Sequence, residues 1–257
     1  MTRRVHIVGC RRSGTTLMME LLWYAYRFSG RHEHETSVFE PVPKEQTLYL
    51  SKKPPDTTHI RRVFLADEQL HLIAMLRDPR AVMASKHPSR PEVYFSDYHR
   101  WRAYVQALRP LQGHRRFLLV RYEDLVTDPT ALQAEIAQKF PFLERQRTFT
   151  QFPEGANVPQ RAQRSLGGAR PFDTARIDGW REHLPRVKGQ LLDHPDLPQM
   201  LIETGYETDD AWTKLLDSVE PYRQQYKDGG PRPWRRFETN MRFALKSWRY
   251  LRRLRAG

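Results

Sequence analysis

The sequence predicts an α/β fold in which a parallel sheet, of the type found in P-loop proteins, is flanked by helices. Residues 4–9 form an apolar run that leads through a glycine-rich loop into residues with helical spacing. Residues 71–76 repeat this arrangement, with proline near the start of the helix that follows. At 257 residues the chain can bury one substantial core.

The first loop, Gly9-Cys10-Arg11-Arg12-Ser13-Gly14, has the layout of a phosphate-binding turn. Backbone N–H groups at such a turn, and the helix N-terminus after it, present donors and partial positive charge to an anion. Nucleotide triphosphatases continue with Gly-Lys-Ser/Thr, whereas here Thr15 and Thr16 follow and the cation lies earlier, at Arg12. The loop therefore predicts phosphate binding without the lysine that reaches a γ-phosphate.

The apolar run over residues 71–76 delivers Arg77 at its end. Ligands gather at the carboxyl edge of an open parallel sheet, so we expect Arg77 to face a second anionic group near the first loop. Ser85, on the following helix, can add a hydroxyl donor. A triphosphatase would have aspartate at this strand end to reach Mg²⁺, so arginine favours a doubly anionic ligand bound without a metal.

The remaining elements follow from apolar periodicity and turn signals. Two further strands are predicted near 47–51 and 116–121. Helices are predicted near 14–28, 57–66, 79–87, 93–109 and 130–140, with a mostly helical stretch over 185–203.

These motifs resemble those of sulfotransferases that use 3′-phosphoadenosine-5′-phosphosulfate (PAPS). The family's 5′-phosphosulfate loop, Lys/Arg-Ser-Gly-Thr-Thr, is matched by residues 12–16, and its arginine and serine for the 3′-phosphate fall on Arg77 and Ser85. Its Tyr-Glu-Asp-Leu signature is matched by residues 122–125. The resemblance extends over residues 4–206 and is nearest to the bacterial, carbohydrate and tyrosylprotein branches.

The resemblance implies a donor-binding set, with the desulfated bisphosphate PAP as product and no metal ion. This set is Arg11, Arg12, Ser13, Gly14, Thr15, Thr16, Arg77, Ser85 and Arg176. Arg176 enters it through a Gly/Arg-rich segment, which includes Arg164 and Gly167 and is expected to close over the 3′-phosphate, although the family's Arg-Lys-Gly pattern is not reproduced.

Sulfuryl transfer needs an in-line attack by the acceptor, a general base and cations near the leaving phosphate. Arg12 is assigned to stabilise the charge of the leaving phosphate and not to donate a proton, because a guanidinium does not release one. Two carboxylates compete as base. Glu40 in Phe-Glu-Pro resembles the carbohydrate branch and is preferred, whereas Glu35 in Glu-Thr resembles the tyrosylprotein branch. Lys52, in an imperfect counterpart of the family's Lys-Thr-Pro element, is expected to approach the phosphosulfate.

The C-terminal region is predicted to form a basic amphipathic extension. Residues 231–257 hold nine Lys or Arg against one acid, and so supply +8 of the net charge of +13. We expect a sulfotransferase domain over 1–218, a Pro/Gly-rich hinge over 219–233 and a helix over 234–257. One face of this helix carries Trp234, Phe237, Met241, Ala244, Leu245, Trp248 and Leu251. The helix is expected either to lie on an anionic membrane or to dock on the domain by this stripe.

The single cysteine, Cys10, excludes an internal disulfide and is interpreted as a small residue filling a tight turn. Without a signal-like or membrane-spanning segment, we expect a cytoplasmic protein, with peripheral membrane attachment if the helix binds lipid.

The predicted function is therefore transfer of a sulfuryl group from PAPS to a hydroxyl or amine. The acceptor class stays open among carbohydrates, lipids, peptides and small molecules, because acceptor loops vary on this fold. The alternatives are a P-loop kinase or other nucleotide-binding enzyme, and a non-catalytic polyanion-binding protein suggested by the pI near 10.1. No specific nucleic-acid partner is expected, and the sequence does not indicate an oligomeric state.

Overall fold

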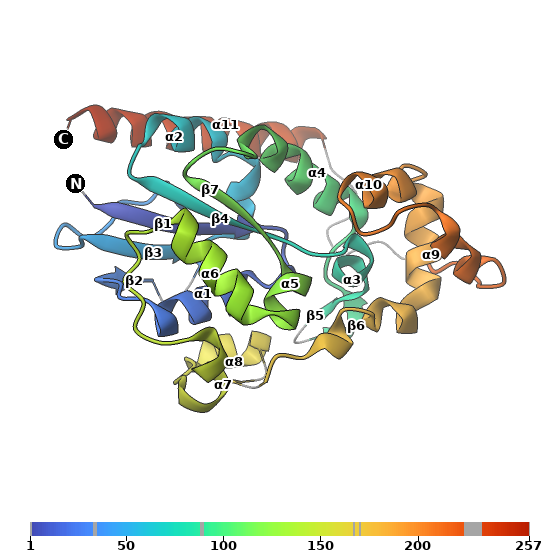
Figure 1. The fold of residues 1–257 in the computed structure, drawn as a ribbon. Coiled ribbons are helices and arrows are strands. Elements are labelled where there is room, and N and C mark those ends of the chain that lie inside the picture. Colours follow the sequence, from blue (N-terminus) through green and yellow to red (C-terminus); the bar gives the residue numbers. More distant parts are fainter. Residues whose placement is uncertain are drawn as a thin grey trace.

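A computed structural model describes residues 2–32, 35–87, 90–166, 168–169, 171–223 and 233–256. Its centre is a five-stranded parallel sheet in the order β2-β3-β1-β4-β7 (Figure 1). The strands are β1 Arg3–Gly9, β2 Gly30–Arg31, β3 Leu48–Lys52, β4 Leu70–Leu76 and β7 Phe117–Arg121. Two short strands, β5 Lys86–His87 and β6 Arg90–Tyr94, form a separate antiparallel pair. The predicted α/β class with a helix-flanked parallel sheet is confirmed.

Alternate residues of the central strands enter different parts of the core. Ile7 of β1 and Ile73 of β4 pack with helix α1 (Thr15–Ala25) and helix α6 (Pro129–Lys139). Val8 and Leu72, one residue away from each, pack with helix α2 (Arg61–Ala66) on the other face. Because both faces are covered, residues 72–76 of β4 form an unbroken run of buried apolar side chains, as expected for a strand in a parallel sheet.

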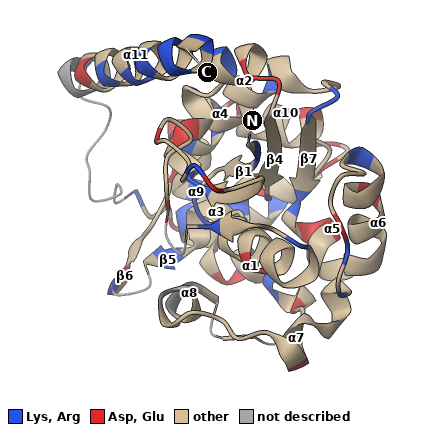
Figure 2. Cartoon of the chain, turned by 90° about the vertical axis from the view of Figure 1, so that its left-hand side faces the viewer, with Lys and Arg blue, Asp and Glu red and all other residues tan. Residues whose placement is uncertain are grey.

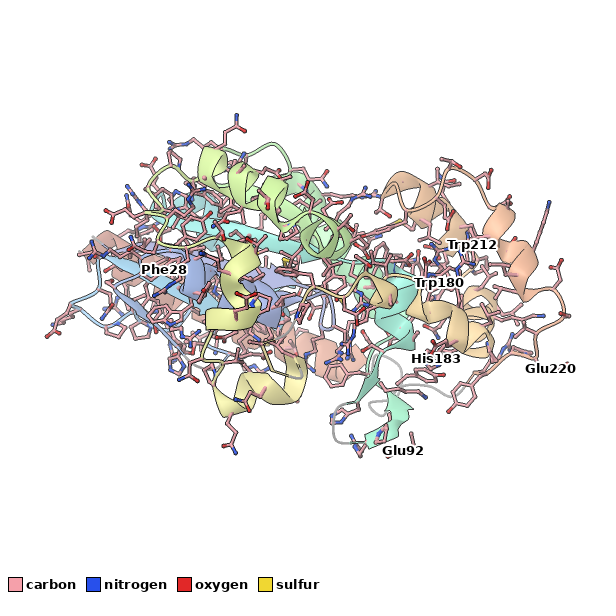
Figure 3. The ribbon with its side chains drawn as sticks, turned by 60° about the horizontal axis from the view of Figure 1, so that its bottom comes forward. Phe28, Glu92, Trp180, His183, Trp212 and Glu220 are labelled. Atoms are coloured by element: carbon pink, nitrogen blue, oxygen red, sulfur yellow. The ribbon has the colours of Figure 1, made fainter. Side chains whose placement is uncertain are left out.

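A second group of helices packs beyond the carboxyl edge of the sheet. It contains α3 Pro79–Ala84, α4 Tyr98–Leu108, α9 Leu184–Asp193 and α10 Leu197–Glu203. Trp180 and Trp212 meet edge to face in its core, with ring centroids 6.2 Å apart (Figure 3). The guanidinium of Arg80 lies over both rings and pairs with Asp78, so this buried charge is compensated.

Short elements complete the chain around this frame. They are α5 Tyr122–Thr127, α7 Phe152–Gly155, α8 Gln160–Leu166 and the 3₁₀ turns Pro54–Thr58, Arg109–Leu111, Phe149–Gln151, Thr174–Arg176, Gly179–His183 and Ala211–Leu216. All four predicted strands are present. The helix expected over 93–109 begins only at Tyr98, because Asp97 caps it by accepting a hydrogen bond from the Arg100 amide at 2.8 Å.

The last helix, α11 (Pro233–Ala256), packs along the sheet face that carries α2 (Figure 1). Phe243 stacks on His59 at 3.9 Å, and the Tyr250 hydroxyl donates a hydrogen bond to Asp67. The predicted docking stripe is not the docking face, since Met241 and Trp248 are 58% and 52% exposed. The expected hinge over 219–233 falls largely outside the described residues, as does the side chain of Trp234.

Candidate active site

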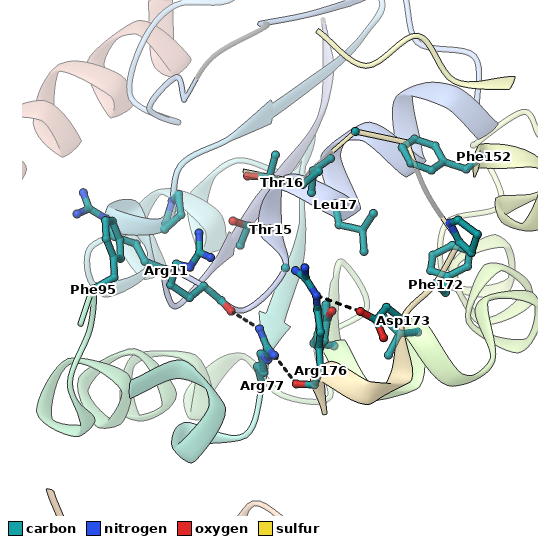
Figure 4. A pocket seen from close by; sticks show the side chains of 18 of the residues that line it. Arg11, Thr15, Thr16, Leu17, Arg77, Phe95, Phe152, Phe172, Asp173 and Arg176 are labelled. Carbon is teal, nitrogen blue, oxygen red and sulfur yellow. Dashed lines mark hydrogen bonds and ion pairs between the residues drawn. The ribbon is translucent and has the colours of Figure 1, made fainter. Parts of the chain in front are cut away.

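A cavity of about 380 Å³ opens where β1 and β4 end and the first loop begins (Figure 4). Its wall comes from segments far apart in the sequence. Its lining includes Arg11, Arg12, Gly14, Thr15, Thr16, Glu35, Arg77, Phe95, Tyr122, Phe152, Phe172, Asp173 and Arg176. This is the carboxyl edge of a parallel sheet, where ligands of such folds bind.

The first loop is held in a conformation that exposes donors to this cavity. Gly9 has φ 125°, and a Cβ there would lie 2.2 Å from the Met75 carbonyl oxygen. Gly14 has φ 90° and precedes α1, and no side chain caps that helix. Arg12 also has a positive φ, 71°, which is uncommon for a residue with a side chain. The N-terminal amides of α1 therefore remain available to an anion.

Arginines from three segments meet at the first loop: one from the loop itself, one that follows β4 and one from the 3₁₀ turn Thr174–Arg176. The Arg12 Nε donates to Ser85 Oγ at 2.7 Å, while Arg77 donates to the carbonyls of Arg12 at 3.2 Å and Arg176 at 2.8 Å. Burial lowers the pKa of Arg12, and the neighbouring charges of Arg77 and Arg176 lower it further. Four of the described lining residues are arginines and two carry carboxylates, so the cavity favours an anionic ligand.

Two predicted donor residues lie differently from what the motif implies. The Ser13 hydroxyl is buried and donates to the Cys10 carbonyl at 2.5 Å, so it braces the loop from within. Ser85 accepts its hydrogen bond from Arg12, whereas Arg77 lies on the cavity wall. Arg77 and Ser85 therefore both lie near the first loop, but the hydrogen bond of Ser85 is to Arg12 of that loop and not to Arg77.

The two candidate bases lie in different surroundings. Lys52 Nζ donates to Thr16 Oγ1 at 2.9 Å and lies 3.8 Å from Glu35 Oε1, and burial lowers the Lys52 pKa. Glu35 is on the cavity wall. The Glu40 side chain is 52% exposed and pairs with Lys246 of α11 at 3.2 Å. The geometry thus joins Glu35, through Lys52, to Thr16, the residue that follows the first loop at the start of α1.

A buried network fixes the backbone that follows Glu35. The Asp56 carboxylate accepts hydrogen bonds from the Ser37 hydroxyl at 2.9 Å and the Val38 amide at 2.6 Å. His6 lies 3.3 Å from Asp56 and 2.8 Å from Ser51 Oγ, and burial lowers its pKa. This network ties the Glu35 segment to β1 and β3.

Several wall residues were not predicted from the sequence. Phe95 lies within cation–π range of Arg11 and Arg12, at 5.7 and 5.9 Å. Phe152 and Phe172 line the side of the cavity opposite Phe95 (Figure 4). These rings come from separate segments without a shared motif, so only the tertiary fold brings them together. Arg176 lines the cavity, whereas Gly167 and the Arg164 side chain lie outside the described residues.

Cys10 has the environment of a packing residue. It is buried, and burial raises the pKa of its thiol to about 12. A thiol that stays protonated is a poor nucleophile, which agrees with its interpretation as a small residue in a tight turn.

Comparisons with known proteins agree with the motifs. The model of a family described as "Sulfotransferase family" matches residues 23–140. A sulfotransferase domain from the curacin biosynthetic pathway is similar in structure, with a TM-score of 0.54 and 13% identity over 80% of this chain and 99% of that one. The sulfotransferase domain of an olefin synthase from Synechococcus PCC 7002 has a TM-score of 0.49 and 17% identity over 70% and 88% of the two chains.

No curated protein sequence matches the chain significantly. At such low identity the structural likeness establishes the fold, while the family match covers Glu35, Lys52, Arg77 and Ser85. The resemblance of this chain to the sulfotransferase family, which its motifs predicted, is therefore confirmed.

Proposed function

We propose that this protein transfers a sulfuryl group from PAPS to a hydroxyl or amine acceptor. The observation that carries the proposal is the convergence of Arg12, Arg77 and Arg176 with an uncapped helix N-terminus on one cavity. A donor with phosphate groups at both its 5′ and 3′ positions needs such a distribution of positive charge.

The cavity has features suited to this donor. Its volume lies in the range of small-molecule sites. The Arg77 Nε is buried and has no hydrogen-bond partner among the described residues, which leaves it able to bind an anionic oxygen. Phe152, Phe172 and Phe95 offer ring faces on which an adenine can stack. We assign the first loop to the 5′-phosphosulfate, and Arg77 and Arg176 to the 3′-phosphate.

In the proposed reaction the oxygen of a hydroxyl acceptor, or the nitrogen of an amine acceptor, attacks the sulfur in line. The new bond joins sulfur to the acceptor, the bond from sulfur to the phosphate oxygen breaks, and the acceptor proton passes to a base. We assign the base to Glu35, and the stabilisation of the departing phosphate to Arg12 and Lys52. Glu35 also borders a second, polar hollow, which Glu40 and Lys53 line as well and to which we assign the approach of the acceptor. Of the two carboxylates, Glu35 is the one that lines both this hollow and the cavity at the first loop.

Titration calorimetry with PAP tests the donor site. We expect Arg77→Ala to weaken PAP binding by about tenfold or more, because a charge-assisted hydrogen bond is lost. Adenosine 5′-monophosphate, which lacks the 3′-phosphate, should bind both proteins about equally. Arg62→Ala, on the exposed side of α2, is the matched control. Unaltered PAP affinity in the Arg77→Ala protein would remove this assignment.

Transfer itself is tested by incubating the protein with PAPS and pools of carbohydrates, lipids, peptides and phenols. Mass spectrometry should detect an acceptor that has gained one SO₃ group, together with release of PAP. Turnover of ATP in place of PAPS, dependent on Mg²⁺, would instead favour the kinase alternative.

A further inference from the structure

Helix α11 has two faces with different surroundings. Its inner face is covered by the domain, where Phe243 and Tyr250 are buried against Phe39, His59 and Asp67. Its outer face carries Met241, Leu245 and Trp248, which are 58%, 47% and 52% exposed. These three residues lie at helical spacing and form a continuous apolar stripe, which we call the outer stripe.

Positive charge borders the outer stripe. Arg242, Arg249 and Arg252 are exposed, and the Arg252 guanidinium lies 5.6 Å from the centre of the Trp248 ring. Lys and Arg are spread along the described length of the helix (Figure 2), and Glu238 is the one acid within residues 233–256. The surface therefore combines a large aromatic ring, two aliphatic side chains and a surplus of cations.

We propose that this outer face binds a bilayer surface that contains anionic phospholipids. Apolar side chains of a basic amphipathic helix enter the boundary between headgroups and acyl chains, while arginines pair with lipid phosphates. Tryptophan prefers this depth because its ring has an apolar body and a polar N–H. Among the described residues, no helix is long and apolar enough to span the bilayer.

The chemistry of the face favours lipid over the other occupants. A second copy would bring an equally basic helix against the first, and like charges would repel. A nucleic acid would satisfy the arginines, but its phosphate backbone gives Met241 and Leu245 no apolar partner. An anionic bilayer satisfies both the cations and the stripe.

The arrangement allows a test that leaves the fold intact. Removing α11 would uncover Phe39 and leave Asp67 without the Tyr250 hydroxyl, so truncation would confuse docking with lipid binding. Substitutions in the outer stripe avoid this problem, because those side chains contribute little to the buried core. The triple variant Met241→Ser, Leu245→Ser and Trp248→Ser should keep the wild-type circular dichroism spectrum and PAP affinity.

The experiment is sedimentation of the full-length protein with vesicles of phosphatidylcholine, alone or mixed with phosphatidylserine. We expect binding only to the mixed vesicles, and weaker binding at high salt. The triple serine variant should bind less by a factor on the order of ten or more, because the apolar contribution is lost. Arg249→Gln with Arg252→Gln should weaken binding about 30-fold, from the loss of two charges near the surface at about 1 kcal/mol each.

A matched control uses exposed leucines elsewhere. Leu192→Ser with Leu215→Ser removes side chains that are 48% and 43% exposed on other elements, and should bind vesicles as the wild type does. Equal binding by the wild type and the triple serine variant, or tighter binding to a short DNA duplex than to the mixed vesicles, would overturn the proposal. PAP affinity is measured separately from vesicle binding. Failure of the lipid proposal would therefore leave the proposed transferase site untouched.

Discussion

At the scale of single residues, Lys52 connects the start of α1, just after the first loop, with the proposed base Glu35. Its ammonium lies between Thr16 Oγ1 and the Glu35 carboxylate and is largely shielded from water. The Lys52 ammonium can therefore contact the Glu35 carboxylate and, in the proposed complex, an oxygen of the sulfuryl donor. Glu40, five residues further on, is paired with α11 instead.

We expect Glu35→Gln to lower turnover by about 10²- to 10⁴-fold, because a glutamine amide cannot accept the acceptor proton. PAP affinity should change little, since Glu35 is assigned to the acceptor side. Glu40→Gln makes the same chemical change nearby and should retain most of the activity. A larger loss in Glu40→Gln than in Glu35→Gln would reverse the assignment.

The lowered pKa of Lys52 predicts an alkaline limit on activity. Burial favours the neutral amine, so Lys52 loses its proton below the ordinary lysine pKa of 10.5. Turnover should therefore fall as pH rises through this lowered pKa, because the neutral amine no longer stabilises the departing phosphate. Lys52→Arg should move the fall to higher pH, as measured by rate profiles with saturating donor.

At the scale of elements, the turn from β1 to the first loop depends on the absence of a side chain at Gly9. We expect Gly9→Ala to lower the free energy of unfolding by about 3 kcal/mol or more, because strain at positive φ adds to a clash with Met75. Gly113→Ala is the control, since Gly113 has φ 78° but open space around it. That change should lower the unfolding free energy by about 1 kcal/mol in urea titrations.

The His6–Asp56 network predicts a pH dependence of stability. His6 has a folded-state pKa below the ordinary 6.5, so its contribution is present above pH 6.5 and is lost as pH falls towards the folded value. His71, whose pKa is lowered to about 4, acts in the same direction. His6→Asn should flatten the slope of unfolding free energy between pH 6.5 and 5, by at most about 1.4 kcal/mol per pH unit. An unchanged slope would show that His6 does not titrate with unfolding.

At the scale of the whole molecule, α11 links distant parts of the chain. Tyr250 contacts Arg4 of β1 and Asp67 after α2, while Lys246 contacts Glu40 in the segment that follows the proposed base. The helix thus contacts both the sheet and the segment beside the candidate active site.

Tyr250→Phe removes a buried hydroxyl and leaves the Asp67 carboxylate with fewer donors. We expect the free energy of unfolding to fall by about 1–3 kcal/mol. Trp248→Phe, on the exposed face of the same helix, should change it by less than about 0.5 kcal/mol. Chemical denaturation of both variants measures the difference, and equal losses would contradict the assignment of the inner and outer faces.

The sequence predicted the frame of the molecule better than the details of its cavity. Apolar runs such as residues 71–76 identify buried strands, and Gly9 and Gly14 identify the loop, because these signals are local. Phe95 and Phe172 enter one cavity only through tertiary packing. One of the two alternatives for α11, docking by its apolar stripe, was wrong for a similar reason, because Met241, Leu245 and Trp248 of that stripe are exposed. The helix docks through Phe243 and Tyr250, because their partners His59 and Asp67 lie on the domain. The longest apolar stripe of the helix has no such partners there among the described residues.

One consequence follows from the position of Arg77. Its guanidinium holds the backbone carbonyl of Arg12 on one wall of the cavity and that of Arg176 on the other. An anion that competes for the Arg77 N–H groups would release the Arg176 carbonyl and so loosen the link between the 3₁₀ turn Thr174–Arg176 and Arg77. Amide hydrogen exchange over residues 173–177 should therefore report nucleotide occupancy, even without a label on the ligand.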